Sequence, residues 1–200
     1  MKKKTVRMVT LAVLSFLLIG CAKTEESSAK KNKIEPTIPK VTTQQDVGAD
    51  MVMLDFASDD KIIFHGYFGL FVYDLNTEKI TQSIDLKPIN CNFTQGDNTC
   101  VVTVNKDGSE VNLHPISSEN MYVYKLDDNT LEEKVYIEMS DPFKMSEAPR
   151  DINEKSYSYV SGSVKFSDED IGYLAGYDMT LGSCIVLRYV RGDKEYVIFK

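Results

Sequence analysis

The 200-residue sequence has no tryptophan and only two histidines, His65 and His114. Neither histidine belongs to a His-x-x-x-His spacing, and no Cys-x-x-Cys pair is present. Because structural zinc sites need such closely spaced ligands, we expect no zinc site. The Gly-x-Ser-x-Gly turn that carries the nucleophile of α/β-hydrolases is also missing. These absences predict a protein with no metal, no cofactor and no catalytic nucleophile.

Four short motifs have the appearance of functional sites but lack the residues that would complete them. Ser58-Asp59-Asp60-Lys61 has the Ser-x-x-Lys spacing of β-lactamases, without the companion Ser-Asp-Asn and Lys-Thr-Gly sequences. Asp127-Asp128-Asn129 and Ser167-Asp168-Glu169-Asp170 offer oxygen ligands for calcium, but neither fits an EF-hand loop. Arg191-Gly192-Asp193 is a three-residue motif of the integrin-binding type, and such motifs recur by chance. We interpret all four as turns between strands.

No apolar run is long enough to cross a bilayer, which needs roughly 20 residues. The longest run, Met8–Ile19, has about a dozen and follows a basic segment with Lys2, Lys3, Lys4 and Arg7. This combination is typical of a secretory signal peptide. The run ends in Leu18-Ile19-Gly20-Cys21, which resembles the lipobox of bacterial lipoproteins.

The lipobox resemblance implies where the mature protein resides. In bacterial lipoproteins the chain is cut before the cysteine, and the thiol is linked to diacylglycerol. Residues 1–20 would then be a signal peptide, and Cys21 would be the lipidation site. Two acyl chains suffice for stable anchoring. We expect a secreted protein that is anchored by lipid to the outer face of the cytoplasmic membrane.

The charge of the chain excludes one class of partner. The formal net charge is −7, but four of the 23 basic residues lie in the expected signal peptide. The remaining 19 basic and 30 acidic residues leave −11. Nucleic-acid binding needs a basic surface to neutralise phosphates. We therefore expect no nucleic-acid partner.

The composition divides the rest of the chain into two parts. Residues 21–49 comprise the candidate lipidated cysteine and a polar segment of mixed charge without any aromatic residue. Such a segment cannot bury enough apolar area to offset the entropy of ordering, so we expect a flexible tether. Residues 50–200 alternate apolar and polar side chains with a period of two, which predicts strands. This body is expected to be all-β.

An internal similarity predicts the architecture of the body. The segment Gly69–Ile80 is echoed by Asn120–Leu131, and each reads as a strand, a polar turn and a following strand. Two further strands precede each copy, and a weaker third copy occupies Val164–Lys200. The body thus resembles three four-stranded meanders of the β-propeller blade type. Since closed propellers use about four to eight blades, we expect a partial propeller or a compact stack of sheets; an irregular β-sandwich or barrel is the alternative.

The expected strands are Met51–Ala57, Lys61–Tyr67, one from Gly69 and Ile80–Leu86; Cys100–Asn105, Glu110–His114, one from Asn120 and Leu131–Met139; Val164–Ser167, Ile171–Tyr177, Ser183–Val190 and Glu195–Lys200. Asp107-Gly108 supplies the positive φ of a tight hairpin turn. The one candidate helix, Lys144–Lys155, is interrupted by Pro149 and is at most short.

Three cysteines lie in the body. Cys91 and Cys100 flank a polar loop, and the compartment outside the membrane is oxidising enough for disulfides. A bridge closing this ten-residue loop would stabilise by up to about 3 kcal/mol. We therefore expect a Cys91–Cys100 disulfide over two free thiols. Cys184 has apolar neighbours and is expected to be a buried thiol.

One segment is a candidate surface for a partner. In His65-Gly66-Tyr67-Phe68-Gly69, two glycines bracket two aromatic residues between strands. His65, Tyr67 and Phe68 could present rings to a protein or a sugar. Packing in the core is the alternative interpretation.

Several segments of the body together resemble a known module. They are MVMLDFAS (51–58), IIFHGYFGLFVYDL (62–75), SIDLKPINC (83–91), TQGD (94–97), HPISSENMYVY (114–124), IGYL (171–174), TLG (180–182) and YVRGD (189–193). The body is similar to the β-rich extracytoplasmic module of clostridial β-lactam-sensing antirepressor regulators of the metalloprotease type. The chain lacks their His-Glu-x-x-His motif and a credible acylation serine. The resemblance thus implies a sensing or docking module without proteolysis or acylation.

The sequence therefore favours a lipid-anchored, non-enzymatic module that binds an envelope sensor protein or a wall-derived ligand. Two alternatives remain open at this stage. The first is a carboxylate-based hydrolase of cell-wall glycan, because acidic residues are plentiful in the loops. The second is a purely structural surface lipoprotein.

Overall fold

The computed structural model describes residues 52–66, 69–92, 100–147, 152, 157, 159–177 and 186–199. The expected signal peptide, the lipidation site Cys21 and the tether lie outside these residues, as do Tyr67, Phe68 and Cys184. In the described part of the chain, no helix is long and apolar enough to span a bilayer.

The described residues form three antiparallel four-stranded sheets, each built from consecutive strands. Sheet 1 contains β1 (Met53–Ala57), β2 (Lys61–His65), β3 (Gly69–Asp74) and β4 (Lys79–Asp85). Sheet 2 contains β5 (Cys100–Val104), β6 (Glu110–Pro115), β7 (Asn120–Lys125) and β8 (Thr130–Val135). Sheet 3 contains β9 (Tyr159–Lys165), β10 (Ile171–Tyr177), β11 (Val186–Arg191) and β12 (Lys194–Phe199). The predicted all-β fold of three meanders is confirmed.

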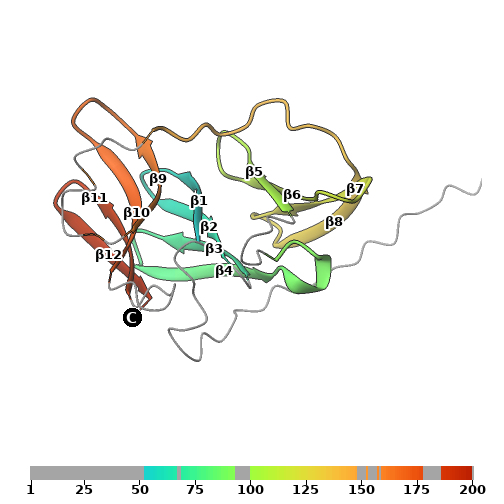
Figure 1. Ribbon diagram of the computed structural model, residues 1–200, viewed down its shortest axis with the longest axis horizontal. Helices are drawn as coiled ribbons and strands as arrows, with labels where there is room; N and C mark the ends of the chain where they lie inside the picture. Colours follow the sequence, from blue (N-terminus) through green and yellow to red (C-terminus); the bar gives the residue numbers. More distant parts are fainter. Residues whose placement is uncertain are drawn as a thin grey trace, which may run out of the picture.

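The sheets lie side by side, with sheet 1 between sheet 3 and sheet 2 (Figure 1). The first strand of sheet 1, β1, contacts both β9 and β5, which are the first strands of the flanking sheets. The three sheets do not close into a barrel. The body is therefore an open stack of blade-like sheets, in which the two flanking sheets each have an inner face toward sheet 1 and an outer face.

The two inner faces bury separate apolar clusters against sheet 1. One cluster joins sheets 1 and 3 and includes Phe64, Phe71 and Tyr189. The other joins sheets 1 and 2 and includes Ile63 and Tyr124. Because sheet 1 is covered on both faces, its strands β2 and β3 are apolar at nearly every position, whereas β7 alternates.

The internal repeat of the sequence is a structural repeat. The buried Leu75 donates its backbone N–H to the carbonyl of Asp60 at 2.8 Å, and Leu126 donates to the carbonyl of Ser109 at 2.9 Å. In each case the turn between the third and fourth strands is thereby tied to the turn between the first and second. Glu78 and Asn129 both adopt positive φ, at 55° and 51°, in the equivalent turns.

The predicted turns are confirmed, and one of them is packed tightly. Gly108 has a φ of 69°, and a Cβ atom there would lie 2.5 Å from the ring of Phe56 on β1. Gly192, in the turn between β11 and β12, has a φ of 57° and open space around it. Gly108 is thus needed both for its backbone conformation and for the contact between sheets 1 and 2.

Some boundaries differ from the predictions. β9 begins at Tyr159 and not at Val164, because its first residues pair with β10. Residues 144–147 of the expected helix are not helical, and Ser146 instead forms a β-bridge with Ser163. A 3-10 turn, η3 (Lys87–Ile89), precedes Cys91.

The predicted Cys91–Cys100 disulfide is wrong: both residues are free thiols, 1% and 3% exposed. They lie in the apolar cluster between sheets 1 and 2. A hydrogen bond shared with the Cys100 side chain, together with burial, raises the pKa of the Cys91 thiol. Disulfide formation requires a thiolate, so this environment favours the neutral thiol pair.

Candidate binding site

His65, which the sequence predicts to be part of a partner surface, is buried. His65 is 6% exposed, and its Nδ1 lies 2.7 Å from Oδ2 of Asp55. Because the imidazole is paired with a carboxylate inside the body, His65 cannot present its ring to a partner. Tyr67 and Phe68 lie outside the described residues.

A β-bulge places Asp55 beside His65. The register of β1 against β2 shifts between Leu54 and Phe56, so that Asp55 is the extra residue. Burial raises the pKa of Asp55, and the charge and hydrogen bond of His65 oppose that rise. Both side chains are less than a tenth exposed. We interpret the pair as a structural contact within sheet 1.

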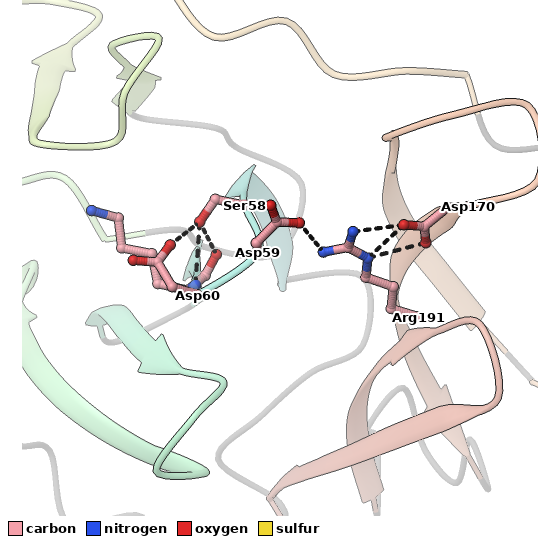
Figure 2. A network of polar contacts seen from close by, with 6 residues as sticks. Ser58, Asp59, Asp60, Asp170 and Arg191 are labelled. Carbon is pink, nitrogen blue, oxygen red and sulfur yellow. Dashed lines mark hydrogen bonds and ion pairs between the residues drawn. The ribbon is translucent and has the colours of Figure 1, made fainter.

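Arg191 of the Arg-Gly-Asp sequence is also engaged within the body, as Figure 2 shows. One guanidinium nitrogen lies 2.7 Å from Asp59 and the other 2.6 Å from Asp170. The guanidinium also stacks 3.6 Å from the ring centre of Phe166. Since Asp59 belongs to the first turn of sheet 1, Arg191 ties sheet 3 to sheet 1 and is not a free ligand for a receptor.

A segment that we call the strap (residues 136–143) crosses the outer face of sheet 2. β8 ends at Val135 and not at the predicted Met139, and Tyr136 donates its N–H to the carbonyl of Glu119 at 2.9 Å. At the far end the Phe143 N–H donates to the carbonyl of Val104 at 2.7 Å, and Pro142 forms a bridge with Asn105. Backbone contacts therefore fix the strap at both ends.

A cavity of about 270 Å³ lies between the strap and the sheet. Strands β5 and β6 form one wall, and the strap forms the other. The lining residues are Val101, Thr103, Asn112, His114, Tyr136, Ile137, Glu138, Met139 and Pro142. The rings of His114 and Tyr136 stack with centroids 3.9 Å apart and planes 17° apart, which makes one end of the cavity flat and aromatic.

Asn112 gives this cavity a buried polar group. The residue is 8% exposed, and its Oδ1 atom accepts no hydrogen bond from the described residues. A buried acceptor without a donor costs about 1–3 kcal/mol. Nearly all such groups in folded proteins are satisfied; this oxygen is an exception, and it has almost no surface accessible to solvent or to the cavity.

A wider and more polar hollow of about 620 Å³ adjoins the cavity, and Met139 lines both. Its walls include Lys106 and three acidic residues, Asp107, Glu110 and Asp141. Hydrogen bonds from Ser109 lower the pKa of Asp107, which keeps that carboxylate ionised. We call the two hollows together the groove; the smaller hollow contains the aromatic pair and Glu138, and the larger one contains the three other acidic residues.

Exposed apolar side chains gather on the same sheet and its strap. Seven large hydrophobic residues are exposed in the described part of the chain, and five of these belong here: Val101, Ile116, Val135, Tyr136 and Ile137. Ile137 is 69% exposed and Val101 48%. Concentrated apolar exposure of this kind marks interaction sites.

Sequence analysis missed this site because it extended the last strand of sheet 2 to Met139. The signal was present in Val135-Tyr136-Ile137, three consecutive apolar residues that break the period-two alternation. No group of three or more His, Cys, Asp and Glu side chains among the described residues is arranged to hold a metal ion.

The sequence was compared with protein-family models and with curated protein sequences. No protein-family model matches the chain, and no curated protein sequence is significantly similar to it.

Proposed function

We propose that the protein is a lipid-anchored extracytoplasmic binding module without catalytic activity, and that the groove on sheet 2 is its recognition site. The observation that carries this proposal is the cavity under the strap, which the stacked rings of His114 and Tyr136 line and which exposed apolar side chains surround. Mostly apolar cavities with a few placed polar groups are the usual form of ligand sites.

The alternative of a wall-glycan hydrolase has less support. Such enzymes use a general acid whose carboxyl pKa is raised, facing a second carboxylate across the substrate. Burial raises the pKa of the Asp55 carboxyl, but this residue lies against His65 inside sheet 1. Asp55 does not line the groove.

The location at the envelope rests on the sequence. The basic N-terminus, the short apolar run and Leu18-Ile19-Gly20-Cys21 support lipidation of Cys21. With a tether after the anchor, the body would stand clear of the membrane, where an envelope sensor protein or a wall-derived ligand can reach the groove. The resemblance to the antirepressor module supports a role as a sensing accessory.

Two experiments on cells that produce the protein test the anchor and the groove separately. Membrane fractionation should find the wild-type chain with the membrane and the Cys21→Ala chain released or unprocessed; unchanged membrane association would refute the anchor. For the groove, a photoreactive amino acid at position 136 should give a discrete adduct. The same residue at position 193, on the exposed turn of sheet 3, serves as the control and should not. Equal labelling from both positions, or saturable turnover of wall glycan by the protein, would contradict the binding module.

A further inference from the structure

We infer that the strap binds an extended, positively charged segment of a partner protein, which pairs with the free backbone of the strap as an added β-strand. This inference deepens the proposed function, on which it rests, by naming the chemistry of the partner that the groove recognises.

The middle of the strap has a backbone without hydrogen-bonding partners. The chain continues from β8 through Tyr136 to Met139 without a turn or bend. The strap is tied to the sheet at its two ends, through Tyr136 and through residues 141–143. Between these ties, no backbone N–H or carbonyl of residues 137–140 forms a hydrogen bond within the described part of the chain. An extended segment with free backbone groups is the template on which a further strand pairs.

The strap lacks the protection that β8, the strand leading into it, has. β8 lies at the edge of sheet 2, and its residues Glu133 and Lys134 are exposed. Charged side chains on an edge strand hinder pairing with another chain. In the strap, by contrast, the exposed side chains beside the free backbone include those of Tyr136 and Ile137. The unpaired backbone and the exposed apolar surface therefore coincide.

The charge of the groove determines the charge of the partner. Its walls carry four acidic side chains and one lysine: Asp107, Glu110, Glu138, Asp141 and Lys106. The carboxylates of Glu110, Glu138 and Asp141 form no ion pair with any described residue. A basic segment would compensate these charges, whereas a second copy of this chain would bring its own acidic groove against them. The groove thus favours a basic partner over self-association.

The length and side chains of the strap specify the segment further. Four residues of extended chain span about 13 Å, which suits one short strand of a partner. In such pairings the main-chain hydrogen bonds supply affinity, and alternate side chains supply specificity. Because successive side chains of a strand point to opposite faces, neighbours such as Ile137 and Glu138 require different partners. We therefore expect a segment in which apolar and basic residues alternate.

Three peptides of one sequence test the backbone pairing. The parent is Lys-Val-Lys-Val-Lys-Val, acetylated and amidated at its ends. One derivative is N-methylated on its valines and the other on its lysines, so each loses the N–H groups of one edge and keeps its charge and side chains. The full chain is titrated calorimetrically in phosphatidylcholine nanodiscs, with empty nanodiscs as the blank.

We expect the parent and one derivative to bind, and the other derivative to bind about tenfold more weakly or worse, because only one edge of the peptide faces the strap. Equal affinity of the two methylated derivatives, whether both bind or neither does, would overturn the inference. Absence of binding by the parent peptide would overturn it as well.

A charge reversal tests the charge of the partner. Glu138→Lys should weaken binding of the parent peptide about tenfold and strengthen binding of a counterpart with glutamate in place of lysine. Glu169→Lys makes the same change in net charge in the turn between β9 and β10 and is the matched control; it should leave both affinities within about twofold. Both glutamates are exposed, so both variants should fold. Similar effects of the two reversals would mean that the peptide responds to net charge alone, against the inference.

The titrations and the cross-linking in cells distinguish this inference from the proposed function. A discrete adduct at position 136 without the expected difference between the peptides would refute the inference and leave the proposed function standing. The expected difference without an adduct would support the inference and contradict the envelope partner. A dimer of the full chain that the parent peptide dissociates would assign the strap to a second copy and overturn the inference.

Discussion

The two flanking sheets differ in how their outer faces are covered, although a single connection, from β8 to β9, supplies residues to both. On sheet 3, Ile152 and the ring of Tyr157 pack on Tyr173 and its neighbours, with the two tyrosine rings 5.6 Å apart edge to face. On sheet 2, the strap is held mainly through its backbone and leaves Tyr136 and Ile137 exposed above a cavity. One face is thus completed as a core, and the other retains a cavity.

This difference shows how an open stack of sheets can acquire a site. The end sheets of an open stack each have an outer face that no further sheet covers, and exposed apolar faces favour association. Side chains of the connecting chain close the face of sheet 3. Because the strap spans sheet 2 without filling the space beneath it, the remaining apolar surface is accessible to a small molecule.

The largest expected effect comes from removing an aromatic side chain from each face. Tyr173→Ala should lower the free energy of unfolding by about 3–5 kcal/mol, because Tyr173 is 6% exposed and central to the covered face. Tyr136→Ala, at 45% exposure, should cost about 1 kcal/mol or less. Urea denaturation of both variants measures the difference, and similar losses would mean that the strap is part of the core.

The turns of the two flanking sheets offer the next comparison. Gly108→Ala should destabilise by about 2–4 kcal/mol, since it combines positive φ with a Cβ against Phe56. Gly192→Ala has the same kind of backbone conformation in open space and should cost about 1 kcal/mol. Thermal and urea unfolding measure the destabilisation of each variant. A larger loss of stability in Gly108→Ala than in Gly192→Ala would show that sheet 2 packs tightly against sheet 1 at Phe56.

Buried polar groups on the two sheets should respond with opposite signs. Ser163 is fully buried on β9 and donates its hydroxyl to the carbonyl of Ser146 at 3.1 Å, so Ser163→Ala should destabilise by about 1 kcal/mol. Asn112→Leu removes an unpaired acceptor and should leave stability unchanged or raise it by about 1 kcal/mol. If denaturant titrations show that both variants are destabilised, the Asn112 side chain stabilises the folded protein.

The smallest effects concern two carboxylates with opposite pKa shifts. Arg191 lowers the pKa of Asp170, so this link between sheets stabilises the fold above pH 3.8 and is lost as the pH falls through the lowered pKa. Burial raises the pKa of Asp55, so its contribution is complete below pH 3.8 and declines as the pH rises through the raised pKa. The free energy of unfolding is measured across acid pH. Asp170→Asn should remove the loss of stability as the pH falls, and Asp55→Asn should remove the loss of stability as the pH rises. Identical profiles for the two variants would contradict this assignment.

Much of the fold could be predicted because its signals are local. The echo of Gly69–Ile80 in Asn120–Leu131 predicted equivalent strands and turns, and the positive φ of Glu78 and Asn129 confirms the equivalence. Asp107-Gly108 lies in a turn, as the sequence predicts, and so does Gly192-Asp193 of the Arg-Gly-Asp sequence, whereas Arg191 ends β11. Hairpins are specified by residues that are neighbours in sequence, so alternation and turn chemistry suffice to locate them.

The candidate site could not be predicted in the same way. The cavity brings Asn112 on β6 together with Ile137 on the strap, and no sequence period relates the two. The burial of His65 depends on a bulge that delivers Asp55, and the state of Cys91 and Cys100 depends on the apolar cluster around them. Each of these features follows from contacts between segments that are distant in the chain.

The sequence by itself determined a β-rich body of repeated hairpins, because side-chain alternation and glycine-containing turns act within a few residues. The sequences of β2 and β3 are also consistent with the central position of sheet 1, because their nearly continuous apolar residues require cover on both faces. Only the tertiary structure decided which outer face was closed and which was left with a cavity and an unpaired acceptor. The physical reason is that burial and hydrogen-bond satisfaction are properties of the assembled surface, which no single segment specifies.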